Sequence, residues 1–168
     1  ISSFEIRGAI WYQGESNRPR AWQYRTLFPA MIEDWRRVFD RPDMPFYFVQ
    51  IAPFGYGGDS GQAAELREAQ ARALELPATG MAVTLDVGNP TDIHPRKKRE
   101  VGERLARWAL GQTYGRELES IAGPMVTDAT VDGDAVVVRF EHADGGLTLE
   151  DGAAGFEVSD AEGNWHPA

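Results

Sequence analysis

The sequence contains no cysteine, and only three of its 168 residues are histidines. The absence of cysteine excludes a disulfide scaffold, a zinc–thiolate site, an iron–sulfur cluster and a cysteine nucleophile. The histidines, His94, His142 and His166, are too scattered to form a ligand set with the spacing of a metal site. The sequence also lacks a phosphate-binding loop and a dinucleotide-binding glycine pattern. We therefore predict neither a metal nor a cofactor.

Long apolar runs are also missing, since no stretch approaches the ~20 residues of a membrane span. Residues 1–8 do not resemble a signal peptide, and they lack an initiating methionine, so residue 1 need not be the true start of the gene product. Hydrophobic residues nevertheless make up 42% of the chain and aromatic residues 11%, which predicts a folded globular protein with a real core.

Basic residues are almost absent from the C-terminal third of the chain. Residues 118–168 contain 11 acids and one base, Arg139, whereas residues 1–117 contain 15 acids and 16 bases. This asymmetry predicts two different units, one at 1–117 and an acidic, β-rich and incomplete one at 118–168. The acidic tail argues against nucleic-acid or anionic-membrane binding, because both require basic patches.

Strand and helix patterns alternate along the first 111 residues. Apolar runs predict strands at 6–12, 46–52 and 81–87. Apolar residues at helical spacing predict helices at 22–38, 62–75 and 95–110, with Gly111 as the last terminator. In the first helix the predicted core positions include Leu27 and Val38, and Pro29 allows a kink or a late start.

Such β-α-β-α-β-α alternation predicts parallel strands in a three-layer α/β/α sandwich. Beyond about residue 120 the pattern changes to short strands, in 131–140, GLTL (146–149) and GFEV (155–158). These strands predict a small antiparallel β unit.

Unusual polar residues follow the first predicted strand. In an open parallel sheet, ligands bind outside the carboxyl ends of the strands. The first such loop contains Gln13, Gly14, Glu15, Ser16 and Asn17, and amide side chains with a glycine N–H are suitable donors to a developing oxyanion. A turn followed by a helix cap from Ser16 or Asn17 is the structural alternative.

The loop after the third strand reads TDIHP (91–95) and contains His94 two residues after Asp92. Alternate residues of an extended segment face the same way, so the pair is a candidate base with its orienting carboxylate. The alternative is a helix-capping aspartate with a surface histidine. Ser60, in the glycine-rich loop after the second strand, would complete a triad, but a flexible surface loop is the better interpretation of that stretch.

Six ordered motifs closely resemble the sialate O-acetylesterase family, serine esterases of the SGNH (GDSL-like) hydrolase class. The resemblance extends over roughly residues 6–160, including the GL…GFEV phrasing of the β unit. The motifs are GAIWYQGESN (8–17), YRTLFPAMIEDWRRVF (24–39), PFYFVQIAPF (45–54), LREAQ (66–70), TGMAVTLDVG (79–88) and DIHPRKKREVGERLA (92–106).

The resemblance implies a flavodoxin-like α/β/α fold and removal of O-acetyl groups from carbohydrates by a Ser–His–Asp mechanism without a cofactor. It implies that His94 is the general base and Asp92 its orienting acid. It also implies that Gln13, Gly14 and Asn17 line the oxyanion site, and that Glu15 holds their loop by buried hydrogen bonds. The extracellular polysaccharide substrates of the family favour a periplasmic or extracellular location.

The family's nucleophilic serine belongs to a GQSN-like motif upstream of the QGESN block, and these 168 residues do not contain that motif. We therefore expect the chain to be the C-terminal part of the esterase, and the missing segment to lie upstream or on another chain. Strand 6–12 would then lack its inner neighbour. Many SGNH enzymes have Asp-x-x-His rather than Asp-x-His, so Asp86 is the reserve candidate for the acid.

Several questions stay open at the level of sequence. Phe54 and Tyr56 are candidates for a sugar-facing wall, with simple packing as the alternative. The motifs do not separate a sialate esterase from a xylan or pectin acetylesterase. An inactive sugar-binding fragment is a further alternative, and a complete enzyme that uses Ser60 is the least favoured one.

Overall fold

The structure is a computed structural model, and it describes residues 4–58, 61–148 and 156–167. The contacts within the chain divide it into two units, Ile1–Gly123 and Pro124–Ala168. In the part of the chain that the structure describes, no helix is both long and apolar enough to cross a membrane.

The first unit is built on a parallel sheet of strands β1 (Ala9–Trp11), β2 (Phe46–Val49) and β3 (Thr79–Ala82). The strands follow the order β1-β2-β3, and residues Ile10, Tyr47 and Gly80 lie in register across them. All residues of β2 and β3 are buried, as expected for apolar strands covered on both faces.

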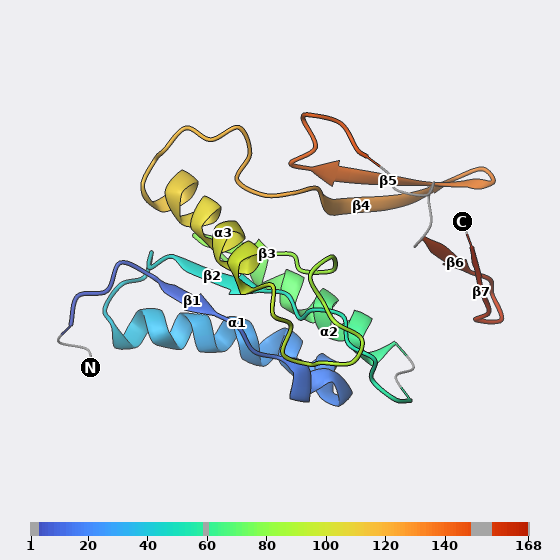
Figure 1. Cartoon of the computed structure of the whole chain (residues 1–168), viewed down its shortest axis with the longest axis horizontal. Helices are drawn as coiled ribbons and strands as arrows, with labels where there is room; N and C mark the ends of the chain where they lie inside the picture. The colour runs from blue at the N-terminus through green and yellow to red at the C-terminus, as the bar shows by residue number, and fades with distance from the viewer. Residues whose placement is uncertain (1–3, 59–60, 149–155, 168) are drawn as a thin grey trace. The chain divides into compact units, whose positions relative to one another are not determined.

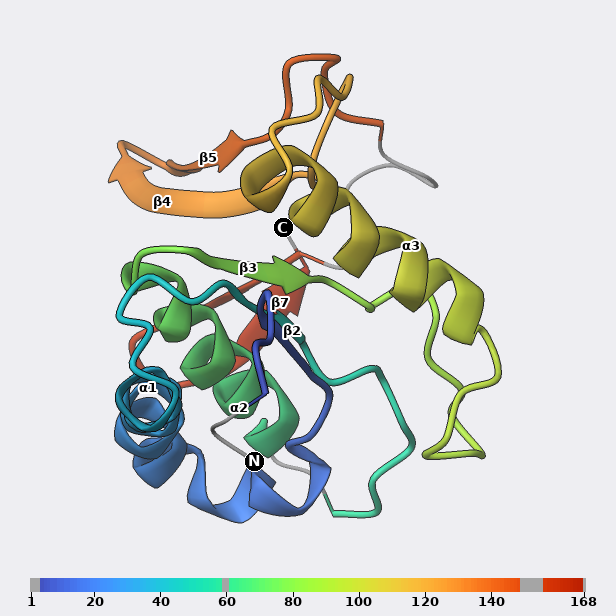
Figure 2. The same cartoon turned by 90° about the vertical axis from the view of Figure 1, so that its left-hand side faces the viewer.

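Helices cover both faces of this sheet (Figure 2). Helices α1 (Ala21–Val38) and α2 (Gln62–Ala71) lie on one face, where Phe28 packs edge-on against Phe46 and Phe48. Helix α3 (Lys98–Trp108) lies on the other, where Trp108 stacks on Tyr47. The predicted three-layer α/β/α fold is confirmed for this partial domain.

Three short helical segments complete the first unit: the 3-10 helices η1 (Glu15–Arg20) and η2 (Arg72–Glu75), and the π-helix η3 (Ala109–Thr113). The prediction of one helix over 62–75 is therefore wrong after Ala71, and that of a helix from Pro95 is wrong before Lys98. Gly111 does not end the last helix, since it lies inside η3.

The three strands are shorter than predicted because apolar residues beyond their ends are buried under loops. Ile51, Ala52 and Val87 are all at most 6% exposed, yet none belongs to a strand. An apolar run therefore records burial rather than strand length here. Conversely β3 begins at Thr79, two residues before the predicted start.

The predicted core face of the first helix is wrong at two positions. Leu27 is 61% exposed and Val38 is 49% exposed. The buried stripe of α1 consists of residues spaced three or four apart, Ala21, Tyr24, Phe28, Ile32 and Arg36. Pro29 lies inside α1, which starts at Ala21 and not later.

The second unit consists of two antiparallel hairpins, as predicted in kind. Strands β4 (Met125–Asp132) and β5 (Ala135–Glu141) form one, and β6 (Glu157–Ser159) and β7 (Trp165–Pro167) form the other (Figure 1). The sequence pattern missed β4 before the turn. The described part of GLTL, residues 146–148, is not a strand, and Leu149 and Gly155 lie outside the described residues.

Candidate active site

Three loops of the first unit meet beyond the carboxyl ends of β1, β2 and β3 (Figure 1). The ring of Tyr12 lies under the ammonium of Lys98, 4.5 Å from the ring centre, so the loop after β1 contacts the start of α3. The guanidinium of Arg18 lies 3.4 Å from the ring centre of Tyr56, which joins the loops after β1 and β2. The N–H of Gly55 donates to the carbonyl of Pro90 at 2.9 Å and joins the second loop to the third.

Within the first loop, the side chains of Gln13 and Asn17 form a hydrogen-bonded pair. The amide nitrogen of Gln13 donates to Oδ1 of Asn17 at 2.7 Å. The hydroxyl of Tyr24 donates to Oε1 of Gln13 at 3.2 Å, and burial raises the pKa of Tyr24, which keeps this donor protonated. The amide N–H groups of Asn17 meet no acceptor among the described residues, so they are available to a ligand.

Gly14 occupies a position between these two amides that only glycine fits. Its φ is 154°, in a region that side-chain-bearing residues rarely adopt. An added Cβ would lie 3.0 Å from Ile51 Cγ2 and 3.1 Å from Gln70 Nε2. Its carbonyl accepts the backbone N–H of Asn17 at 2.7 Å, which closes the turn. The cap alternative is not observed: Gly14 precedes η1 and Arg20 precedes α1, with no side-chain cap at either.

Glu15 begins η1 and is half-buried. Its carboxylate makes no hydrogen bond with the residues that the structure describes, so the buried bonds expected of it are not seen there. Its charge contributes to raising the pKa values of Tyr12 and Tyr24, after burial, the largest cause in both.

His94 is exposed, and Asp92 lies beside it in a tight turn. Oδ1 of Asp92 accepts the backbone N–H of His94 at 2.9 Å. Among the described residues no hydrogen bond joins the Asp92 carboxylate to the imidazole ring. Asp92 does not cap α3 either, because Lys97 holds the N-cap position.

Asp86, the reserve acid, is paired with an arginine. Its two carboxylate oxygens accept from Arg104 at 2.6 and 2.5 Å, and Arg104 also donates to the carbonyl of Val83 at 2.6 Å. The hydrogen bonds from Arg104 are the largest cause of a lowered pKa at Asp86. These hydrogen bonds link the segment after β3 to helix α3.

Phe54 and Tyr56 pack against each other, edge to face, with ring centres 4.8 Å apart. Both are half-buried, and Arg18 covers a face of Tyr56. Ser60 lies outside the described residues.

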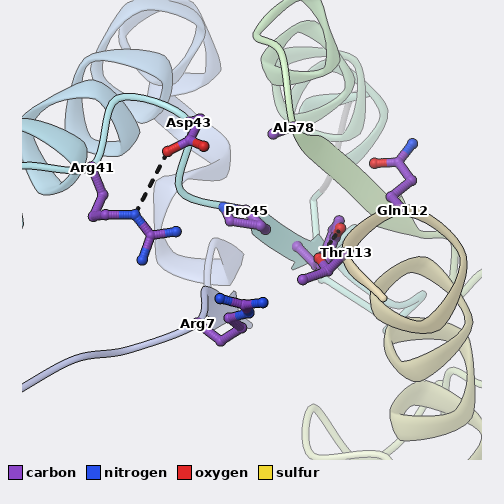
Figure 3. A pocket seen from close by; sticks show the side chains of 8 residues that line it. Arg7, Arg41, Asp43, Pro45, Ala78, Gln112 and Thr113 are labelled. Carbon is purple, nitrogen blue, oxygen red and sulfur yellow. Dashed lines mark hydrogen bonds and ion pairs between the residues drawn. The ribbon is translucent and has the colours of Figure 1, made fainter. Parts of the chain in front are cut away.

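A hollow of about 620 Å³ lies at the opposite, amino end of the sheet (Figure 3). Its lining includes Arg7, Arg41, Tyr47, Gln112 and Thr113, and contains none of the predicted site residues. It holds no histidine and no carboxylate paired with a nucleophile. We therefore place the candidate chemistry at the carboxyl ends of the strands and not in this hollow.

Comparison with known proteins gives the family. The family model described as carbohydrate esterase, sialic acid-specific acetylesterase, matches residues 1–111. The chain belongs to this family. The sequence-based family assignment is thus confirmed, while the role of each residue stays a prediction.

Similar proteins bear related names. The sialate O-acetylesterase of Mus musculus is 31% identical over 144 residues, and that of Homo sapiens is 32% identical over 145. These stretches are 74% of this chain but only 27% and 28% of the relatives, so the chain matches little more than a quarter of their length. The crystal structure of a carbohydrate acetylesterase from Xanthomonas citri matches with a TM-score of 0.87 and 42% identity, over 99% of this chain and 40% of that one.

One residue at this family site escaped the sequence analysis. Gln70, fully buried on α2, accepts the N–H of Ile51 at 2.9 Å and donates to the carbonyls of Gln13 and Val49, each at 3.2 Å. It thereby ties the first loop to the end of β2. Its signal was a polar residue on the buried stripe of α2, next to Ala69.

Proposed function

We propose that the chain carries the base and oxyanion half of an esterase that removes O-acetyl groups from carbohydrates. The observation that carries this proposal is the Gln13–Asn17 amide pair, held in a loop that contacts the element following His94. Membership of the acetylesterase family supports the reaction class.

Asn17 is the better oxyanion donor of the two amides. Gln13 uses an amide N–H on Oδ1 of Asn17, and this bond fixes the Asn17 carboxamide with its own N–H groups free among the described residues. A fixed donor requires no reorganisation when charge develops on the substrate oxygen. Gln13, itself held by Tyr24 and Gln70, then acts as the residue that positions Asn17.

Asp92 is a better partner for His94 than Asp86. Oδ2 of Asp92 has no hydrogen-bond partner among the described residues, and the exposed imidazole can rotate toward it. Both oxygens of Asp86 are already occupied by Arg104. We assign the orienting role to Asp92 on this ground.

The nucleophile is assigned to a segment upstream of this chain that pairs with β1. Within the described residues β1 pairs only with β2, so one of its edges is open. On the face where Trp108 covers Tyr47 and Gly80, their register partner Ile10 is 71% exposed. Trp11 Nε1 is buried and has no hydrogen-bond partner among the described residues. An added strand and its helix would cover Ile10.

In the proposed reaction the upstream serine Oγ attacks the acetyl carbonyl carbon while His94 takes its proton. Asn17 stabilises the oxyanion, and His94 returns the proton to the departing sugar hydroxyl, leaving an acetyl-serine. Water then attacks with His94 again as base, and acetate leaves. Phe54 and Tyr56, which pack against each other, form the proposed aromatic wall for the sugar.

The test is labelling by a fluorophosphonate probe, which modifies an activated serine, followed by peptide mapping. The chain alone is expected to remain unlabelled. The chain joined to its upstream segment is expected to take label upstream of residue 1, and His94→Ala should abolish it while His142→Ala should not. Label on Ser16 or Ser60 of the chain alone would overturn the upstream assignment. Sugar binding without any label would favour the inactive sugar-binding alternative.

Kinetics then test the residue roles. They are measured, without the probe, on the form of the protein that reacts with the probe. Asn17→Ala should lower kcat on an acetylated sugar by about 10²–10³-fold, whereas its exposed neighbour Ser16→Ala should have little effect. Equal kcat in both variants would remove Asn17 from the oxyanion site. A panel of acetylated sialate, xylan and pectin identifies the sugar.

A further inference from the structure

Tyr12 lies where all three loops of the candidate site come together. It directly precedes Gln13, and the ammonium of Lys98 lies over its ring, 4.5 Å from the ring centre. Its hydroxyl is buried without a hydrogen-bond partner among the described residues. Burial is the largest cause of a raised pKa at Tyr12, followed by electrostatic interactions with Glu15 of the same loop and Tyr56 of the loop after β2.

Lys98 occupies an unfavourable position by the rules of helix electrostatics. It is the first residue of α3, where the positive end of the helix dipole disfavours a cation. The electron-rich face of the Tyr12 ring offsets this repulsion. Lys98 makes no ion pair with a described residue, so the aromatic contact is what holds its ammonium at the loop.

The contact connects the two halves of the proposed machinery. Lys98 follows His94 by four residues, and Tyr12 precedes the Gln13–Asn17 pair. On the other side of the same loop, Arg18 lies over Tyr56. Residues 12–18, called the oxyanion loop below, are therefore held by two cation–π contacts, one at Tyr12 and one at Arg18.

We propose that Tyr12 and Lys98 are positioning residues, whose cation–π contact fixes the oxyanion loop relative to the loop that carries His94. This inference rests on the proposed esterase function for its catalytic meaning, but the coupling of the loops is measurable without activity. A displacement of about 1 Å between reacting groups can cost about 10²-fold in rate, so a weak contact here has a large effect.

The first experiment measures amide hydrogen exchange by NMR in the full chain. The reporters are the N–H groups of Asn17, bonded to Gly14, and of His94, bonded to Asp92. Loss of the contact in Lys98→Met should speed exchange at both by about two- to five-fold, the equivalent of a partly exposed cation–π contact. Lys98→Arg, which keeps a cation, should restore slow exchange.

Two matched variants separate the contact from general effects. Lys97→Met removes the same charge one residue earlier and should leave both reporters unchanged. Tyr12→Phe keeps the ring and should also leave them unchanged, whereas Tyr12→Leu should match Lys98→Met. Amides of β2 report on the whole fold in every variant. Wild-type exchange at both reporters in Lys98→Met would overturn the proposal.

The second experiment measures kinetics without the probe. It uses the form of the protein that reacts with the fluorophosphonate, either the chain alone or the chain joined to its upstream segment. Lys98→Met should lower kcat by at least about ten-fold with KM nearly unchanged, and Lys98→Arg should recover most of it. If exchange responds but no form has esterase activity, the function fails and the loop coupling stands. If activity is present and neither reporter nor kcat responds, the positioning role is refuted.

Discussion

Gln70 provides a quantitative test of how the candidate site is held. The residue is fully buried on α2, and its amide makes three hydrogen bonds, to Ile51, Val49 and Gln13. Gln70→Met replaces the amide by an apolar chain of similar length. The change leaves no cavity for water to enter, but it leaves the N–H of Ile51 without its acceptor.

The magnitude follows from the three bonds. A buried N–H without a partner costs about 2 kcal/mol, and each bond lost from a carbonyl oxygen about 1 kcal/mol. The added apolar surface of methionine offsets about 1 kcal/mol. The net loss is about 3 kcal/mol of unfolding free energy, or a shift of about 1.5 M in the urea midpoint for a slope near 2 kcal/mol/M.

The assay is urea unfolding followed by tryptophan fluorescence in a Trp165→Phe background. That background removes the tryptophan of the second unit, so the signal reports on the first unit alone. Gln112→Met is the matched control, because the side chain of Gln112 is exposed and makes no hydrogen bond with a described residue. The control should change the unfolding free energy by less than about 0.5 kcal/mol.

An equal midpoint for Gln70→Met and the control would refute the argument that the Gln70 amide holds the end of β2. A reduced midpoint with unchanged chemical shifts at Gln13 would refute only its link to the first loop. We expect both a reduced urea midpoint and changed chemical shifts at Gln13, since the same amide nitrogen donates to Gln13 and Val49.

Two further predictions concern the packing and charge around α3. Gly80→Ala would place a Cβ 2.4 Å from the Trp108 ring and should destabilise the fold by at least about 1–3 kcal/mol in urea unfolding. Gly102→Ala, which has open space around it on α3, should instead stabilise the fold by about 0.4–1 kcal/mol. Similar effects of the two substitutions would contradict the packing. Because Arg104 lowers the pKa of Asp86, the contribution of this ion pair to stability is fully present above about pH 4 and is lost as the pH falls through the lowered value. Asp86→Asn should therefore cost less than about 1 kcal/mol at pH 7, and this cost should shrink as the pH falls below about 4. A cost that stays constant in acid would point to another cause.

The layer order of the first unit was predictable because the apolar periods of the second and third helices match their burial. Leu66, Ala69 and Ala73 are buried at helical spacing, and so are Val101 and Leu105. Such spacing is local, so a sequence displays it directly.

The first helix shows where such patterns stop being sufficient. Arg36 is 5% exposed on the buried stripe of α1, where its guanidinium donates to the carbonyls of Met44, Pro77 and Ala78. Its acceptors lie up to 42 residues away in sequence. Hydrophobic periodicity assigns an arginine to the surface, and only the tertiary structure supplies the carbonyls that make its burial tolerable.

The candidate site divides in the same way. The positions of Gln13, Asn17 and His94 followed from the rule that loops at the carboxyl ends of parallel strands meet. The bonds among them did not, because an amide can face several partners. The structure places the Gln13 nitrogen on Asn17 and the Asp92 carboxylate on the backbone of His94, whereas the sequence suggested two equivalent amides and a carboxylate on the ring.

The open edge of β1 bears on where a nucleophile can enter this site. A strand that pairs in parallel with β1 at that edge would run in the same direction and end beside Tyr12 and Gln13. The loop after such a strand would therefore reach the amide pair and the loop of His94 without crossing the sheet. An antiparallel partner would instead present its carboxyl end near Gly8, at the other end of β1. The proposed upstream serine is thus compatible with the site only if its strand joins the sheet in parallel, as the alternation of strands and helices in this chain already favours.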